Sequence, residues 1–220
     1  MKEKQIPLFP GQYEPLKLLS NLERREVEPL AFKILCTIED FCVKAQIAGS
    51  IRRCRPLIND IDIVVQTEDP SSVKPERLRY SQPRVGDTVS NRHHWLDVIK
   101  EVRREFDAST EKQGDALATL HVPFASKQGQ GYVQVDLYKA TEATWGILLL
   151  VRTGSADHNI YLCNLALAKG LRLQYSQGLV DKDGKVIAGK TEEEVFAALG
   201  LPFIIPQDRE IKPGPLRRNK

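Results

Sequence analysis

The amino-acid sequence predicts an α+β fold, and two patterns support that prediction. Apolar residues recur at three- and four-residue spacing over residues 23–43, as in an amphipathic helix. Apolar and polar residues alternate over residues 116–124 and 131–138, on either side of a glycine-containing loop, which is typical of a β-hairpin. A chain that combines amphipathic helices with an antiparallel strand pair belongs to the α+β class.

The composition is that of an ordinary globular protein. Of its 220 residues, 41% are hydrophobic and 28% charged, which is sufficient to bury a core. The net charge of +3 permits nucleic-acid binding but does not establish it. The four cysteines form no Cys-x-x-Cys pair, so we expect reduced thiols and a cytoplasmic location. No segment of the sequence has membrane-spanning length, and we expect no membrane association.

The N-terminal segment contains a short candidate docking motif. Residues 1–15 include three prolines and one glycine, which predicts an irregular arm. Within this arm, Gln5, Leu8 and Phe9 form a Gln-x-x-Leu-Phe sequence that resembles the peptide with which bacterial replication and repair proteins bind the sliding clamp. Such an arm would offer its two apolar side chains to pockets on the clamp. Alternatively, the same side chains pack against the arm's own domain.

The strongest functional signal lies in residues 47–65. A predicted strand ends at Gly49, where the backbone can approach a ligand closely, and Ser50 opens a short helical turn. Backbone N–H groups and a hydroxyl at such a turn can bind phosphate oxygens. Arg52 and Arg53 follow at once and could neutralise the charge of the phosphates.

An Asp-x-Asp pair follows this turn. In an extended strand Asp60 and Asp62 share one face, while Ile61 and Ile63 share the other and can be buried. Two carboxylates so close together repel each other, which lowers stability unless a divalent cation lies between them. Mg²⁺ prefers such oxygen ligands. An isolated Asp-x-Asp is common and often has no function. Its position just after the Gly-Ser-x-x-Arg turn favours a site for a metal ion and a polyphosphate.

The remaining elements follow in order. We expect a long surface loop over residues 66–91, a helix over 92–106 capped by Asn91, and then the hairpin. The second arm of the hairpin places Asp136 on its polar face, where it can stand beside the Asp-x-Asp pair if the two strands are neighbours. Two helices, a second hairpin and a capped helix should complete the chain; we expect them over residues 145–152, 156–169, 171–188 and 191–200.

Four segments together resemble the family X DNA polymerases, the relatives of DNA polymerase beta. They are the Gly-Ser turn, the Asp-x-Asp strand, the strand of Asp136, and the turn Thr153-Gly154-Ser155 with Asn159 beyond it. The resemblance implies a nucleotidyltransferase palm, with a mixed or antiparallel sheet and helices on one face, and a small C-terminal α/β lobe. The implied divisions are an N-terminal arm (1–22), the palm (23–142), a nucleotide-closing lobe (143–210) and a basic tail (211–220).

The resemblance also implies an activity. The implied reaction is the addition of nucleotides from an NTP or dNTP to a primer 3′-hydroxyl. It would use a two-metal mechanism with Mg²⁺, for which Mn²⁺ could substitute. The implied role is gap filling in DNA repair or replication. The implied partner is primer–template or gapped DNA, and we expect a monomer. The implied catalytic and metal-binding residues are Asp60, Asp62 and Asp136. The implied nucleotide-binding residues are Gly49, Ser50, Arg52, Arg53, Arg152, Thr153, Gly154, Ser155 and Asn159.

Some positions depart from the family pattern. Val151 and Arg152 replace a Tyr-Phe pair that usually rejects ribose, Cys163 replaces an arginine, and Gln134 and Tyr138 replace basic residues. We therefore expect weak discrimination between ribose and deoxyribose. The sequence also lacks the family's lyase and helix-hairpin-helix modules, so lyase activity is not expected. Two alternatives stay open: a template-independent nucleotidyltransferase acting on nucleic acid, protein or a small molecule, and a non-catalytic clamp-associated binding module.

Overall fold

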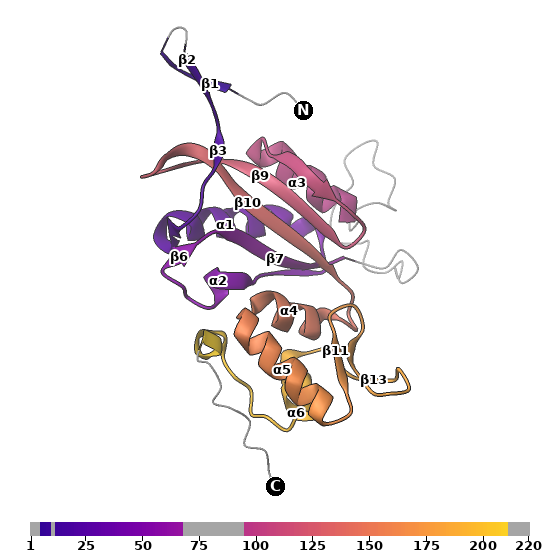
Figure 1. Cartoon of the computed structure of the whole chain (residues 1–220). Coiled ribbons are helices and arrows are strands. Elements are labelled where there is room, and N and C mark those ends of the chain that lie inside the picture. Colours follow the sequence, from indigo (N-terminus) through magenta and orange to yellow (C-terminus); the bar gives the residue numbers. More distant parts are fainter. Residues whose placement is uncertain (1–4, 10–11, 68–94, 211–220) are drawn as a thin grey trace, which may run out of the picture.

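The computed structural model describes residues 5–9, 12–67 and 95–210. It contains a body built around a sheet and a second, smaller lobe of helices and short strands (Figure 1). Most of the surface loop expected over residues 66–91, the predicted cap at Asn91 and the basic tail lie outside the described residues. None of the described helices is long and apolar enough to cross a membrane.

The body is organised around a mixed, six-stranded sheet. Five strands lie in the order β5-β7-β10-β9-β8, and β3 pairs with β10. Strand β10 runs parallel to β7 and β3, and the remaining pairs are antiparallel. The α+β class is therefore confirmed. The strand bounds are β3 (Lys17–Leu18), β5 (Lys44–Ile47), β7 (Asp60–Gln66), β8 (Ser109–Gln113), β9 (Leu117–Ser126) and β10 (Gly129–Ala140).

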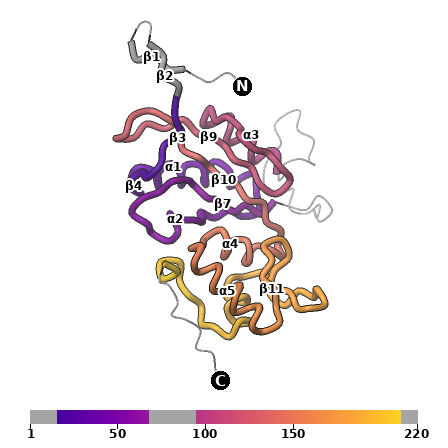
Figure 2. Tube along the Cα trace, in the orientation of Figure 1, coloured from indigo at the N-terminus to yellow at the C-terminus, as the bar shows by residue number. Residues whose placement is uncertain are grey.

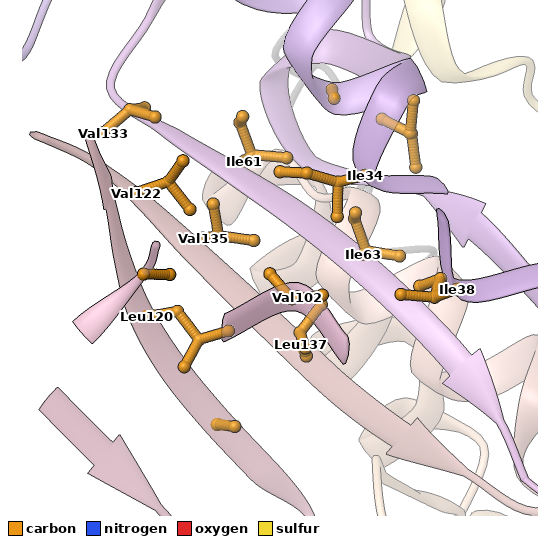
Figure 3. Close-up of a cluster of buried hydrophobic side chains, with 14 of the residues drawn as sticks. Ile34, Ile38, Ile61, Ile63, Val102, Leu120, Val122, Val133, Val135 and Leu137 are labelled. Carbon is orange, nitrogen blue, oxygen red and sulfur yellow. The ribbon is translucent and has the colours of Figure 1, made fainter. Parts of the chain in front are cut away.

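Two helices, α1 (Arg24–Ile38) and α3 (Trp95–Phe106), cover one face of this sheet. Figure 3 shows aliphatic side chains from these helices meeting those of the central strands; they include Ile34, Ile38 and Val102 from the helices and Ile61, Ile63, Val135 and Leu137 from the sheet. Each fully buried aliphatic side chain contributes roughly 1.5–3 kcal/mol. Because side chains alternate along a strand, the opposite face of β7 and β10 is left for their polar residues.

Short elements complete the body. Helix α2 (Gly49–Arg52) joins β5 to the β6–β7 segment, and η1 (Glu39–Phe41) follows α1. Strand β4 (Leu22–Glu23) pairs with β6 (Leu57–Ile58). The N-terminal segment was expected to be irregular, and this expectation was wrong: β1 (Gln5–Phe9) pairs antiparallel with β2 (Gln12–Pro15). Proline is tolerated in an edge strand, because the N–H group that it lacks would face solvent there and would make no hydrogen bond to a neighbouring strand.

The smaller lobe has its own hydrophobic core. Its elements are α4 (Trp145–Thr153), α5 (Ala156–Ala168), β11 (Arg172–Gln174), β12 (Gly178–Val180), β13 (Val186–Ala188), α6 (Glu192–Ala198) and η3 (Pro206–Glu210). The predicted hairpin is instead a three-stranded sheet, because a turn after Gln174 splits its first arm into β11 and β12. The predicted N-cap is confirmed, since the Thr191 hydroxyl accepts a hydrogen bond from the Glu194 N–H at 3.1 Å.

Helix α4 joins the two parts of the molecule. Figure 2 follows the chain from β10 into α4, and a third apolar cluster fills the junction. In this cluster Leu148 and Leu149 of α4 pack with Val64 of β7 and Tyr138 of β10. Val64 and Tyr138 point to the face opposite the helix-covered one, so α4 covers one end of the polar face and brings its last turn close to the Asp-x-Asp strand.

Candidate active site

Three carboxylates meet on the polar face of β7 and β10. The strands are parallel neighbours, and Asp136 lies directly opposite Asp62 in the register. Ligand oxygens of Asp60, Asp62 and Asp136 all lie within 4.8 Å of one another. The prediction for Asp136 required its strand to be a neighbour of the Asp-x-Asp strand, and β10 does pair with β7. Three carboxylates at this separation suit a divalent cation with oxygen ligands.

Neutral donors hold the third carboxylate in place. The Thr119 hydroxyl donates to Asp136 Oδ1 at 2.6 Å, and Gln134 Nε2 donates to Asp136 Oδ2 at 2.9 Å. The Tyr138 hydroxyl lies 3.4 Å from the same Oδ2. Burial, followed by the charges of Asp62 and Asp136, raises the pKa of Tyr138, so its hydroxyl stays protonated as a donor. Gln134 and Tyr138, two positions at which the sequence departs from the family pattern, thus contact the Asp136 carboxylate itself. Thr119 was not predicted, because its place opposite Asp136 depends on strand pairing.

The triad is electrostatically strained without a cation. Burial raises the pKa of Asp62 to about 7, and the charges of Asp60 and Asp136 add to this effect. Burial and Asp136 also raise the pKa of Asp60, although Arg53 partly opposes the rise. A bound divalent cation would relieve both the desolvation and the repulsion. The donor set therefore fits a metal ion such as Mg²⁺.

We expect the strain to appear in the pH dependence of stability. Because the pKa of Asp62 rises from 3.8 to about 7 on folding, the folded protein retains a proton that the unfolded chain loses. This contribution to stability is complete below pH 4 and is lost as the pH rises through 7. With divalent cations chelated, the free energy of unfolding should fall by as much as about 4 kcal/mol between pH 4 and pH 8. Urea unfolding of the wild type and Asp62→Asn would measure it; equal pH slopes in the two proteins would contradict the prediction.

The Gly-Ser turn lies against the triad. Gly49 has φ +59° and packs so tightly that a Cβ there would lie 1.9 Å from Asp62 Oδ2. The Ser50 Oγ atom is buried and has no hydrogen-bond partner among the described residues. An unpartnered buried hydroxyl costs free energy, which a ligand oxygen could recover. The turn thus presents an unused polar group next to the carboxylates.

A pocket of about 370 Å³ opens beside this turn. Its acidic side is formed by Asp60 and Asp62, and its cationic side by Arg53, Arg55 and Arg152. Its size lies within the range of small-molecule sites. Charges of both signs facing one cavity suit a metal-bound polyphosphate, in which cation and anion occupy adjacent positions. The remaining lining residues are Asn21, Gly49, Ser50, Leu57 and Asn59.

Four of the nine predicted nucleotide-binding residues line the pocket; they are Gly49, Ser50, Arg53 and Arg152. The Arg152 guanidinium lies 4.1 Å from the Tyr138 ring centroid and 5.5 Å from that of Tyr175. Its Nε atom is buried without a partner in the described part of the chain. Arg53 is anchored by its Nη1, which donates to the Thr153 carbonyl oxygen. Both arginines therefore line the cavity while their guanidinium groups are positioned by contacts with neighbouring residues.

Arg52 and Thr153 lie instead between the body and the lobe. Arg52 Nη1 donates to Thr153 Oγ1 at 2.7 Å, and its Nη2 pairs with Glu192 Oε2 at 2.6 Å. The same Glu192 accepts from Arg209 Nη1 at 2.7 Å. Arg209, Glu192 and the Thr153 side chain are all buried. Sequence reasoning missed this network, because its members stand far apart in the chain and no local pattern marks them.

The other three predicted residues also make internal contacts. Gly154 adopts φ +72° and lies beside Arg53. The Ser155 hydroxyl donates to the Arg209 carbonyl at 2.8 Å and accepts from the backbone of α5. Asn159 Nδ2 donates to the Val151 carbonyl at 2.8 Å, whereas its buried Oδ1 has no partner among the described residues. The Thr-Gly-Ser turn thus holds α4, α5 and η3 together next to the pocket.

Comparison with known proteins finds similarity to DNA polymerases. Residues 148–210 match the family described as DNA polymerase beta thumb. The DNA polymerase/3'-5' exonuclease PolX of Bacillus subtilis (strain 168) is 28% identical over 169 residues, which cover 76% of this chain and 24% of that protein. DNA polymerase lambda of Rattus norvegicus is 31% identical over 172 residues, which cover 74% of this chain and 28% of that protein.

The chain spans about a quarter of the length of these two relatives. The matched region nevertheless includes most of the chain described above, and the thumb match extends from α4 to η3. The α+β architecture, the order of the motifs and both similarities agree with the resemblance seen in the sequence. The chain belongs to the family X DNA polymerases.

Proposed function

We propose that this chain is a DNA polymerase-type nucleotidyltransferase that adds nucleotides from an NTP or dNTP to a primer 3′-hydroxyl. The observation that carries the proposal is the meeting of three carboxylates within 4.8 Å beside a pocket that also presents Ser50 and Arg53. Both relatives named above are DNA polymerases. Gap filling in repair or replication is the role we favour.

The carboxylates supply the metal-binding half of the site. Asp60, Asp62 and Asp136 would hold one Mg²⁺, and Asp60 and Asp62 a second. When bound there, two such ions would supply Lewis-acid chemistry, lowering the pKa of the attacking hydroxyl and neutralising charge on the triphosphate. Asp136 is held from Oδ1 by Thr119 and from Oδ2 by Gln134, which fixes the orientation of its carboxylate. In the proposed reaction Asp136 accepts the proton of the primer hydroxyl as its oxygen bonds to the α-phosphorus, and pyrophosphate leaves from the opposite side.

The cationic half of the pocket binds the nucleotide. The Ser50 hydroxyl and the Arg53 guanidinium contact the outer phosphates, and Arg152 adds charge from the lobe. Arg52 acts indirectly, because its ion pair with Glu192 holds α2 against the lobe. Thr153, Gly154, Ser155 and Asn159 do not line the pocket; in the proposed complex their turn, next to it, would position the sugar and base. A nucleotide bound in this way would offer partners to the unpartnered buried atoms of Ser50 and Arg152, which both line the pocket.

Primer extension tests the proposal. Gapped, nicked-tail and single-stranded substrates would each be supplied with dNTPs and either Mg²⁺ or Mn²⁺. We expect template-directed extension, most efficient on the gapped substrate. Extension of the single strand alone would favour the template-independent alternative. No incorporation on any substrate would contradict the proposal and favour the non-catalytic binding module.

Sugar discrimination is expected to be weak. Val151 and Arg152 occupy the positions of the family's Tyr-Phe pair, and Arg152 stacks on Tyr138 rather than supplying an aromatic wall. Comparing the incorporation of matched ribo- and deoxyribonucleotides opposite one template base measures this. A preference for deoxyribonucleotides above roughly a thousandfold, about 4 kcal/mol, would contradict the prediction.

Sliding-clamp binding through Gln5, Leu8 and Phe9 stays a prediction. Residues 5–9 form β1, and an extended backbone is the conformation that clefts on a partner usually accept. A peptide of residues 1–12 should compete with a known ligand for a bacterial clamp at micromolar concentration. Absence of competition at high micromolar concentration would exclude this partner.

A further inference from the structure

The Arg152 side chain contacts two tyrosine rings that come from different parts of the chain. Its guanidinium lies 4.1 Å from the ring centroid of Tyr138 in β10 and 5.5 Å from that of Tyr175. Tyr175 belongs to the turn between β11 and β12 in the lobe. A guanidinium within about 6 Å of a ring centroid is attracted to the ring as a cation–π pair. Strand β10, helix α4 and this turn therefore meet at one cation.

The two rings restrict the direction in which the guanidinium points. The Arg152 Nε atom is buried and has no hydrogen-bond partner within the described ranges 5–9, 12–67 and 95–210. A long arginine side chain has much rotamer freedom unless contacts remove it. No hydrogen bond fixes this nitrogen, so the aromatic contacts carry a large part of the orientation of the side chain.

The direction of this guanidinium matters for the carboxylate triad. Arg152 and Asp62 line the same pocket. Burial raises the pKa of Asp62, the charges of Asp60 and Asp136 add to the rise, and the charge of Arg152 opposes it. The Tyr138 hydroxyl, on the ring that Arg152 contacts, lies 3.4 Å from Asp136 Oδ2. A displaced guanidinium would therefore remove positive charge from the wall that faces the carboxylates.

Tyr175 contributes little to the core of the lobe. It is 55% exposed, and the hydrophobic core of the lobe does not include it. Truncating an exposed side chain on a turn usually changes stability by less than about 0.5 kcal/mol. Tyr138, in contrast, is buried in the apolar cluster at the junction with α4. Tyr175 is consequently the ring that can be removed without disturbing the fold.

We propose that Tyr175 is a positioning residue for the incoming nucleotide, because its ring holds the Arg152 guanidinium against Tyr138 and so keeps a positive charge directed at the pocket. The inference rests on the proposed function, in which Arg152 adds charge to the nucleotide site. It gives a role to a residue that the proposed function does not use. Tyr175 acts through Arg152 and needs no contact with the nucleotide.

Calorimetric titration with dATP, in the presence of Mg²⁺ and without DNA, tests this role. Tyr175→Ala should weaken dATP binding by roughly three- to tenfold, because one of the two aromatic contacts of Arg152 is lost. Tyr175→Phe keeps the ring and should bind dATP within about twofold of the wild type. Phe32→Ala is the matched control. Phe32 is an aromatic residue of similar exposure, 52%, that lies on α1 and does not line the pocket, so its truncation should leave dATP binding unchanged.

A double-mutant cycle separates positioning from an independent contact. In an Arg152→Gln background, Tyr175→Ala should weaken dATP binding by less than about twofold further, since the cation that it positions is gone. A further loss as large as in the wild-type background would overturn the inference. So would unchanged dATP binding in Tyr175→Ala, or binding by Tyr175→Phe as weak as that by Tyr175→Ala. Thermal unfolding of each variant checks that it is folded.

The NMR signal of the Arg152 Nε–H group provides a readout that needs neither nucleotide nor primer. The signal is identified by its absence in Arg152→Gln, and the ring currents of the two tyrosines should separate it from the signals of exposed arginines. Tyr175→Ala should move it towards those signals, whereas Tyr175→Phe should leave it close to its place. An unmoved signal in Tyr175→Ala would contradict the positioning role even in a protein that binds no dATP.

The two proposals fail separately in these experiments. A protein that binds dATP and responds to the Tyr175 variants as expected, but extends no primer, contradicts only the polymerase function. A protein that extends primers while Tyr175→Ala binds dATP like the wild type contradicts only the role of Tyr175. In an active polymerase, Tyr175→Ala should raise KM for the dNTP by roughly three- to tenfold and change kcat by less than about twofold.

Discussion

Replacing Asp136 by asparagine should lower primer extension by at least about a thousandfold, or about 4 kcal/mol of transition-state stabilisation. The change removes the charge of the third carboxylate, which would hold a metal ion and receive the hydroxyl proton. Its effect on folding should be small. Asparagine keeps the shape of the side chain and an oxygen that can accept from Thr119, and the Gln134 amide can turn to pair with the new NH₂ group. Single-nucleotide incorporation at saturating dNTP measures the loss.

Asp115→Asn is the matched control for this variant. Asp115 is exposed and lies outside the carboxylate cluster, so the same substitution there should leave incorporation unchanged. Thermal unfolding should show Asp136→Asn to be as stable as the wild type or more stable, since it removes one of three repelling charges. Incorporation at the wild-type rate by Asp136→Asn would remove both the polymerase and the template-independent transferase as candidate functions.

The triad was predictable from the sequence because it depends mainly on local geometry. Alternation along a strand places Asp60 and Asp62 on one face whatever the tertiary structure. The position of Asp136 needed one further fact, the pairing of β7 with β10, and only the family resemblance suggested it. The Thr119 hydroxyl needed a second pairing, β9 with β10, and was missed.

The roles of neighbouring arginines were less predictable. Arg52 and Arg53 are consecutive at the end of α2, and consecutive residues of a helix point about 100° apart. Arg52 consequently faces the lobe and Glu192, while Arg53 faces the pocket. The sequence shows that both arginines are present, but not the direction in which either side chain points. The partner of Arg52 lies 140 residues away, so no periodicity could indicate it.

Strands β8 and β3 were not predicted from the sequence, for a related reason. Strand β8 is largely exposed and polar, and it lacks the alternation by which strands are recognised. Its backbone pairing with β9 at the sheet edge, rather than a buried face, makes it a strand. Strand β3 has two residues and exists only where the chain passes alongside β10. Tertiary contact determines both strands, and it is not visible in a local pattern.

Gly49→Ala should abolish most of the activity by displacing Asp62. An alanine Cβ would lie 1.9 Å from Asp62 Oδ2 and 2.8 Å from its Cγ, so either the carboxylate or the turn must move. The backbone at φ +59° adds roughly 1–2 kcal/mol for any residue with a Cβ, and the overlap adds roughly 1–3 kcal/mol more. We expect a loss of primer extension of about a hundredfold or more, together with a lower melting temperature.

Gly184→Ala separates the two causes. Gly184 also has a positive φ, +81°, but a Cβ there would meet no atom within 4 Å. This variant should therefore show the backbone cost alone, with normal primer extension. Activity in Gly49→Ala equal to that in Gly184→Ala would mean that Asp62 tolerates displacement, and its assignment as a metal ligand would fail. A loss confined to Gly49→Ala would show that glycine is required there because the carboxylate takes the space of a side chain.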